Sequence, residues 1–160
     1  CRTLEDCARV LDALKDPAKL QDWRHYGGLL TLMSYGVTPT MNPTAEQQIE
    51  FIEGLKRALP PEHLAFIEQL QTSFTCGDFF FVHAGVRPGV SLDKQNEQDL
   101  LWIRDEFLNS EERFDKYIVH GHTPVSAPDV RPNRINIDTG AYATGNLTLL
   151  TIQGDSLLAI

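Results

Sequence analysis

The sequence lacks three features that would each point to a defined class of protein. It has no long apolar run, because Phe79–Val82 is only of strand length and a membrane-spanning helix needs about 20 apolar residues. It has no excess of basic residues: 14 Lys and Arg face 22 Asp and Glu, a net charge of −8, which argues against a protein that follows nucleic-acid phosphates. Its three cysteines show no CxxC spacing, which disfavours a zinc ribbon and favours a reducing compartment, the cytoplasm. We therefore expect neither a membrane nor a nucleic acid as a partner.

The sequence also lacks an initiator methionine and a signal peptide. It begins at Cys1, without a basic segment followed by an apolar one, and a helical pattern starts almost at once. Its 160 residues, 42% hydrophobic and 22% charged, have the composition of an ordinary globular domain. We interpret the chain as a piece of a longer protein.

Residues 1–71 are predicted to be helical. A stripe of apolar residues with helical period consists of Leu4, Cys7, Ala8, Leu11 and Leu14. That helix ends at Asp16-Pro17, and further helices are predicted over residues 17–27, 29–35, 45–58 and 61–70, with a loop at 37–43. Thr44 and Gln47 form a capping-box pattern at the start of the third of these.

Residues 72–160 are predicted to form a sheet. Short apolar or alternating runs indicate strands at residues 79–82, 117–119, 135–137, 147–152 and 156–160, with one helix over 99–107. A helical segment followed by a sheet-forming segment predicts an α/β or α+β fold.

Three of the predicted strands end in the same way. Each delivers a polar residue and a glycine to a loop: His83-Ala84-Gly85, His120-Gly121-His122 and Asp138-Thr139-Gly140. If these strands are parallel neighbours, the three loops meet at one edge of the sheet, where open α/β sheets place their sites. Imidazole is a good ligand for zinc, iron or manganese. The alternative is that the histidines only form hydrogen bonds at strand ends, which is the interpretation we give to His25 and His63 in the helices.

Three segments, in this order, resemble a known family. His83-Ala84-Gly85 after an apolar strand, Asp99-Leu100-Leu101-Trp102, and Val119-His120-Gly121-His122-Thr123-Pro124 are similar to the last three sequence blocks of the phosphoprotein phosphatases. These are serine/threonine-phosphatase-like enzymes of the calcineurin-like metallophosphoesterase superfamily. Trp102-Ile103-Arg104 and Asp138-Thr139-Gly140-Ala141-Tyr142 are most similar to the bacterial members. The resemblance implies a β-sandwich flanked by helices, with residues 1–71 as the variable helical cap region and 72–160 as the C-terminal half of the core.

The resemblance also implies a two-metal phosphoester hydrolase that uses manganese, iron or zinc. By the family's pattern His83 and His122 bind one of the ions, and His120 lies beside that ligand, where it orients water or a carboxylate. Arg104 holds the phosphoryl oxygens, since a guanidinium makes two parallel bonds to phosphate. An ordinary surface ion pair is the alternative for Arg104.

Three further residues receive roles from the same resemblance. Arg87 is a candidate residue of the substrate rim, Tyr142 offers a hydroxyl at the edge of the site, and Asp99 is interpreted as structural. The expected substrate is a phosphorylated protein or a small phosphoester.

The sequence departs from the family at its start. The GDxHG, GDxxDRG and GNHE blocks, which supply the other ligands and the general acid, are absent. The three GD or GN pairs, Gly77-Asp78, Gly145-Asn146 and Gly154-Asp155, are not followed by the family's residues. We therefore predict that the chain alone holds no ion or one ion weakly, is inactive, and forms a homodimer through surface that the missing half would cover.

Other interpretations remain open from the sequence. Pro124 favours the phosphoprotein phosphatases over the phosphodiesterases of the superfamily, but it does not separate a protein phosphatase from a diadenosine-tetraphosphate hydrolase. A non-catalytic binding or scaffold module on a degenerate phosphatase fold is a second hypothesis. A mononuclear zinc hydrolase with His83, His120 and His122 as ligands is a third, without an obvious general base.

Overall fold

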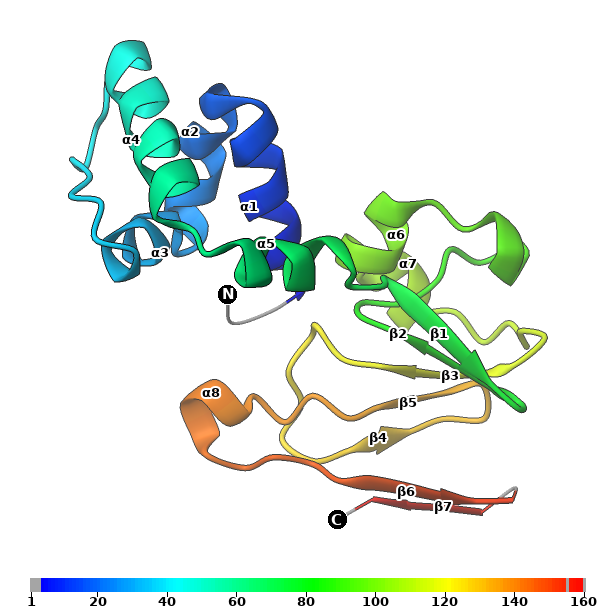
Figure 1. The fold of residues 1–160 in the computed structure, drawn as a ribbon. Helices are drawn as coiled ribbons and strands as arrows, with labels where there is room; N and C mark the ends of the chain where they lie inside the picture. The colour runs from blue at the N-terminus through cyan, green and yellow to red at the C-terminus, as the bar shows by residue number, and fades with distance from the viewer. Residues whose placement is uncertain (1–3, 155, 160) are drawn as a thin grey trace. The chain divides into compact units, whose positions relative to one another are not determined.

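The computed structural model describes residues 4–154 and 156–159 (Figure 1). The chain forms two compact units, Cys1–Leu70 and Gln71–Ile160, which we call unit 1 and unit 2 and describe separately. Across the described residues, no helix combines the length and the apolar character that crossing a bilayer would require.

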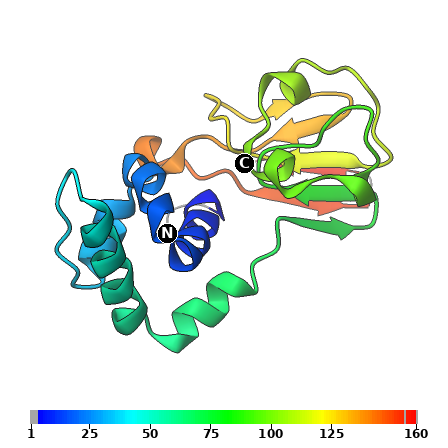
Figure 2. The ribbon, with the colours of Figure 1, turned by 90° about the horizontal axis from the view of Figure 1, so that it is seen from above.

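Unit 1 consists of helices. They are α1 (Leu4–Lys15), η1 (Pro17–Lys19), α2 (Leu20–Trp23), η2 (Arg24–Tyr26), α3 (Gly28–Ser34), α4 (Ala45–Ala58) and α5 (Pro61–Glu68). The helix expected over residues 17–27 is instead a short α-helix between two 3₁₀ turns, and it ends where Gly27 adopts a left-handed φ of 93°. Figures 1 and 2 show α1, α2 and α4 side by side.

The capping box predicted at the start of α4 is present. The Thr44 hydroxyl accepts a hydrogen bond from the Gln47 backbone N–H, and the Gln47 side chain accepts one from the Thr44 N–H. The helices close over one apolar core, whose fully enclosed members are Ala13, Leu20, Leu32, Ile52 and Leu55. The buried face of α4 consists of Phe51, Ile52 and Leu55, whereas Ile49 is 53% exposed.

Unit 2 contains both helices and strands. Its strands are β1 (Ser73–Cys76), β2 (Phe79–Val82), β3 (Tyr117–His120), β4 (Asp129–Val130), β5 (Arg134–Asn136), β6 (Leu150–Gln153) and β7 (Ser156–Ala159). Its helices are η3 (Leu92–Lys94), α6 (Glu97–Trp102), α7 (Asp105–Leu108) and α8 (Ala141–Thr144). Five strands form one open sheet in the order β1-β2-β3-β5-β4, and β6 pairs with β7 as a hairpin. The central strands β2, β3 and β5 are parallel, and the two edge strands are antiparallel to their neighbours.

Both faces of the central sheet are covered. On one face Phe80 and Ile118 pack with Phe107 of α7 and with residues of α6. On the other face Val119 and Ile135 pack with apolar side chains of β6 (Figure 1). Burial on both faces explains why β2 reads as a continuous apolar run and does not alternate. Unit 2 therefore has a mixed sheet with helices on one face and the β6-β7 hairpin on the other, and the chain as a whole has a mixed α/β fold.

Unit 2 differs from the sequence prediction in several of its strands and helices. Strands β1 and β4 were not predicted, because the first is largely exposed and the second has only two residues. The helix expected over 99–107 is divided in two, since Ile103 and Arg104 leave the helical conformation. Strand β6 begins only at Leu150, and α8 precedes it.

Candidate functional site

The three polar loops predicted from the sequence lie at one edge of the sheet. Because β2, β3 and β5 are parallel neighbours, His83, His120 and Asp138 follow or end strands that point the same way. Backbone hydrogen bonds connect the loops: Gly121 N–H donates to the His83 carbonyl at 2.9 Å, and Ile137 N–H donates to the His120 carbonyl at 2.9 Å. The expected convergence of these strand ends is confirmed.

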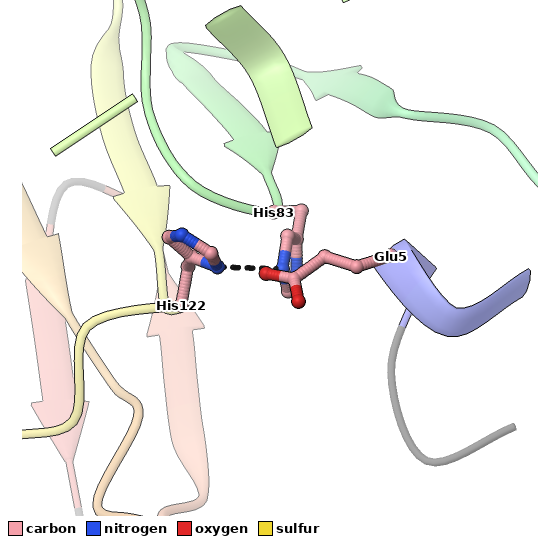
Figure 3. A group of neighbouring side chains, drawn as sticks. All are labelled: Glu5, His83 and His122. Atoms are coloured by element: carbon pink, nitrogen blue, oxygen red, sulfur yellow. Dashed lines mark hydrogen bonds between the residues drawn. The ribbon is translucent and has the colours of Figure 1, made fainter. Parts of the chain in front are cut away.

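Two imidazoles meet at this edge. Nε2 of His83 lies 3.2 Å from Nδ1 of His122, and the ring centroids are 5.0 Å apart (Figure 3). We call these two residues the histidine pair. Glu5, which Figure 3 also labels, belongs to unit 1, whereas both members of the histidine pair belong to unit 2.

The spacing of the histidine pair fits two ligands of one metal ion. Imidazole nitrogens bind zinc at about 2.0–2.1 Å, so two of them at a tetrahedral angle lie about 3.3 Å apart. The observed separation of 3.2 Å is close to that value. Two neutral nitrogens are an incomplete ligand set for a zinc, iron or manganese ion, which also needs further donors.

The backbone around His122 is shaped to present its ring. Its φ of 67° lies in the left-handed region, and it is the only such residue other than glycine among residues 4–154 and 156–159. Left-handed φ values are uncommon for side-chain-bearing residues and often mark functional sites. The preceding Gly121 lies close to Asp138, since a Cβ at Gly121 would be 3.1 Å from the Cβ of Asp138. A side chain at position 121 would therefore be accommodated only if Asp138 moved by a few tenths of an ångström.

Trp102 and Arg104 reach the same loop from the end of α6. The Trp102 ring lies edge-on to the His122 ring, with centroids 6.0 Å apart and an interplanar angle of 90°. Arg104 donates from Nη1 to the Thr123 hydroxyl at 3.1 Å. No carboxylate in the described part of the chain forms an ion pair with Arg104. The guanidinium therefore keeps donors that an anion can use.

Arg87 lies beside these residues but is occupied by carboxylates. Its guanidinium forms a two-point ion pair with Asp99 and a third contact with Glu106. The hydrogen bonds from Arg87 lower the pKa of Asp99, and the same contacts raise the pKa of Arg87. Arg87 and Asp99 line a cavity of about 330 Å³ together with Trp102 and Arg104. The role of Arg87 in substrate binding stays a prediction.

His120 is placed differently from the histidine pair. Its side chain is 2% exposed and its ring packs edge-on against Phe107, with centroids 4.9 Å apart. Nδ1 lies 3.2 Å from the Gly121 carbonyl oxygen. Burial lowers the pKa of His120 to about 4, so the ring is neutral at pH 7. This environment is typical of a histidine that packs at a strand end, and its predicted catalytic role stays a prediction.

The structure adds residues that the sequence did not single out. Asn136, 2% exposed, donates to the Thr123 carbonyl at 2.8 Å and accepts from the Asp138 N–H at 3.0 Å. The signal in the sequence was a polar residue between two isoleucines on a predicted strand. Tyr142, by contrast, is 80% exposed on α8, and its predicted role at the site edge stays untested.

Comparison with known proteins gives a fold and no family. No family model matches the sequence, and no curated protein matches it. The structure is similar to the crystal structure of a protein described as a "putative diadenosine tetraphosphatase", with a TM-score of 0.54 and 18% sequence identity. The match covers 84% of this chain and 72% of that chain. At this identity the likeness concerns the fold alone.

Proposed function

We propose that this chain is part of a metal-dependent phosphoester hydrolase of the phosphoprotein phosphatase type. The histidine pair supplies two ligands of one ion, and Arg104 binds the phosphoryl oxygens. The observation that carries this proposal is the 3.2 Å approach of His83 and His122 at the carboxyl edge of parallel strands.

The surroundings of the histidine pair support the assignment. Arg104 is anchored on Thr123, the residue after His122, so a cation with spare donors lies one residue from a metal-binding nitrogen. Bound ions in such sites supply charge stabilisation at phosphorus and an activated water. The role of this chain's own residues is to orient the groups of the site. Trp102 packs against the His122 ring, and the Thr123 hydroxyl orients the Arg104 guanidinium by accepting its hydrogen bond.

The substrate is a phosphate ester or a phosphoanhydride. The similar structure bears the name of a diadenosine tetraphosphatase, which makes a dinucleoside polyphosphate the alternative to a phosphorylated protein. Both substrates present a phosphoryl group whose oxygens Arg104 and an ion bound by the histidine pair would hold. The segment that ends in Thr123-Pro124 does not distinguish between these two classes of substrate.

We further propose that these residues alone do not complete the active site. The histidine pair offers no negative charge to an ion, and the carboxylate-bearing blocks of the family do not occur in the sequence. An ion held by two neutral ligands is weakly bound. Catalysis would then require the remaining ligands from further sequence of the same protein.

The test is the activity of the protein translated from the whole reading frame that contains these residues. Purified with Mn²⁺, it is expected to hydrolyse p-nitrophenyl phosphate, and His122→Asn is expected to lower kcat by at least about 100-fold, because such metal sites supply several kcal/mol of transition-state stabilisation. His63→Asn, an exposed histidine of unit 1, is the matched control and should leave kcat unchanged. Full activity of His122→Asn would refute the proposal.

A further inference from the structure

The Arg87 guanidinium has all three of its nitrogens on carboxylates. Nε lies 2.6 Å from Asp99 Oδ2, Nη2 lies 2.5 Å from Asp99 Oδ1, and Nη1 lies 2.8 Å from Glu106 Oε2. Three of its five N–H donors are engaged in this way, and the two carboxylates neutralise the charge that would attract a substrate phosphate. Arg87 is therefore built into the protein as part of a two-point pair with Asp99.

Asp99 is the buried member of that pair and belongs to the first turn of α6. Its residue is 6% exposed, whereas the Arg87 side chain is 41% exposed. Asn96 caps the helix by accepting the Asp99 N–H at 2.8 Å, and its amide also donates to the Asp99 carboxylate. Because the carboxylate is enclosed, loss of Arg87 would leave a buried charge without its main partner.

Further bonds connect the same two segments. The loop after β2, which begins with His83, is joined to α6 by the Ala84 N–H, which donates to the Leu100 carbonyl at 2.8 Å. The Gln95 side chain, just before α6, accepts the Arg87 N–H at 2.7 Å and donates to the Arg87 carbonyl at 3.0 Å. The start of α6 is thus fixed to the loop that carries one member of the histidine pair.

The C-terminal end of α6 contacts His122, the other member of the histidine pair. Trp102 closes the helix and lies edge-on to His122, and Arg104, two residues later, bonds to Thr123. Helix α6 has only six residues, so a displacement of its first turn is carried to its last. The position of the Trp102 ring therefore depends on what holds the first turn.

We propose that Arg87 and Asp99 are positioning residues, whose ion pair holds the end of α6 against the histidine pair. Arg87 then acts on the site through Trp102 and Arg104 and does not bind the substrate itself. The consequence for metal binding rests on the proposed function. The consequence for Trp102 does not, because it concerns the protein without any ion.

The experiment uses the full chain with Trp23→Phe, which leaves Trp102 as the only tryptophan. Arg87→Met, Asp99→Asn and the double variant are compared in this background. Two quantities are measured: the acrylamide quenching constant of Trp102 fluorescence without metal, and the dissociation constant for Co²⁺ together with its visible absorption band. The band reports the coordination geometry and would not move if the pair only contributed general stability.

The matched control is Arg131→Met. Arg131, directly after the short edge strand β4, forms an ion pair at 2.9 Å with Asp129 of that strand, and both side chains are more exposed than Asp99. Arg87→Lys is the variant to use if Arg87→Met does not fold. It keeps the charge but loses the two-point geometry.

Each single variant and the double variant are expected to raise the quenching constant to a similar level. Each is also expected to weaken Co²⁺ binding about tenfold and to change the absorption band, as is typical when a partner that orients a ligand is lost. Similar effects in the single and double variants indicate one shared interaction. Arg131→Met should match the background protein.

Two results would overturn the inference. One is an unchanged quenching constant in Arg87→Met, and the other is an effect of Arg87→Met that Asp99→Asn does not share. If the background protein binds no Co²⁺ while the quenching constants follow the expectation, the ion site proposed for the histidine pair is absent from this chain and the positioning role stands, whereas the proposed function itself is tested by the kcat of the protein from the whole reading frame.

Discussion

Protonation of His120 should make the stability of unit 2 depend on pH. The unfolded chain binds this proton near the ordinary pKa of 6.5, whereas burial lowers the native pKa to about 4. The unfolded state therefore binds more protons between these values, and the free energy of unfolding falls as the pH falls from 6.5 to 4. One pKa unit corresponds to about 1.4 kcal/mol, so the full loss is about 3 kcal/mol, of which about 2 kcal/mol occurs between pH 7 and pH 5.

The pH range in which stability is lost distinguishes His120 from Asp99, the buried carboxylate of unit 2. The pKa of Asp99 is lowered from its ordinary value of 3.8, so its contribution to stability is present above that value and is lost only at more acidic pH. A fall in stability between pH 7 and pH 5 is therefore assigned to the histidine. Phe107, which packs on the ring, provides the apolar surroundings that disfavour the charged form.

The assay is urea unfolding at pH 7 and pH 5, followed by Trp102 fluorescence in the Trp23→Phe background. His120→Gln removes the titrating group, so its free energy of unfolding should change about 2 kcal/mol less between the two pH values than that of the background protein. His63→Gln, on an exposed position of unit 1, is the control and should keep the background slope. Parallel losses of stability in the background and in His120→Gln would refute the assigned environment of this ring.

Two further substitutions test the packing of each unit. Gly85→Ala places a Cβ 2.2 Å from Cδ1 of the buried Phe107 ring, so the free energy of unfolding should fall by about 1–3 kcal/mol in urea unfolding followed by Trp102 fluorescence. Gly89→Ala is the control, because nothing lies within 4 Å of the added Cβ and only the backbone effect of the substitution remains. Thr44→Ala removes the cap of α4 and should cost about 1 kcal/mol in thermal unfolding followed by circular dichroism. Thr44→Ser should retain most of that stability, and equal melting of the two variants would contradict the capping role.

The sequence predicted the elements whose stability is local or whose burial is uniform. The capping pattern at Thr44 defined the start of α4, and the apolar run Phe79–Val82 defined β2, because each signal is confined to a few neighbouring residues. The edge strand β1 carried no such signal, since three of its four residues are exposed. The division between α6 and α7 was also missed, because the apolar residues of 99–107 do not reveal that Ile103 and Arg104 leave the helical conformation.

The identity of the main residues of the candidate site could be predicted from the sequence, but their hydrogen-bond partners and burial could not. The strand-loop pattern pointed to His83 and His122, and the parallel strands place the loops that carry them at one edge. The family resemblance pointed to Arg104, which reaches Thr123 from the end of α6. The partners of Arg87 could not be predicted, because an ion pair between residues 12 positions apart depends on how a helix returns to a loop. The buried position of His120 likewise comes from packing against Phe107, 13 residues earlier in the chain.

The central claim is that His83 and His122 bind the same ion. Calorimetric titration of the chain with Zn²⁺ tests it directly, using His83→Asn and His122→Asn with His25→Asn and His63→Asn as controls. Each of the first two variants is expected to abolish the binding that the unmodified chain shows, and the two controls should retain it. Unchanged Zn²⁺ affinity in either His83→Asn or His122→Asn would contradict the shared site.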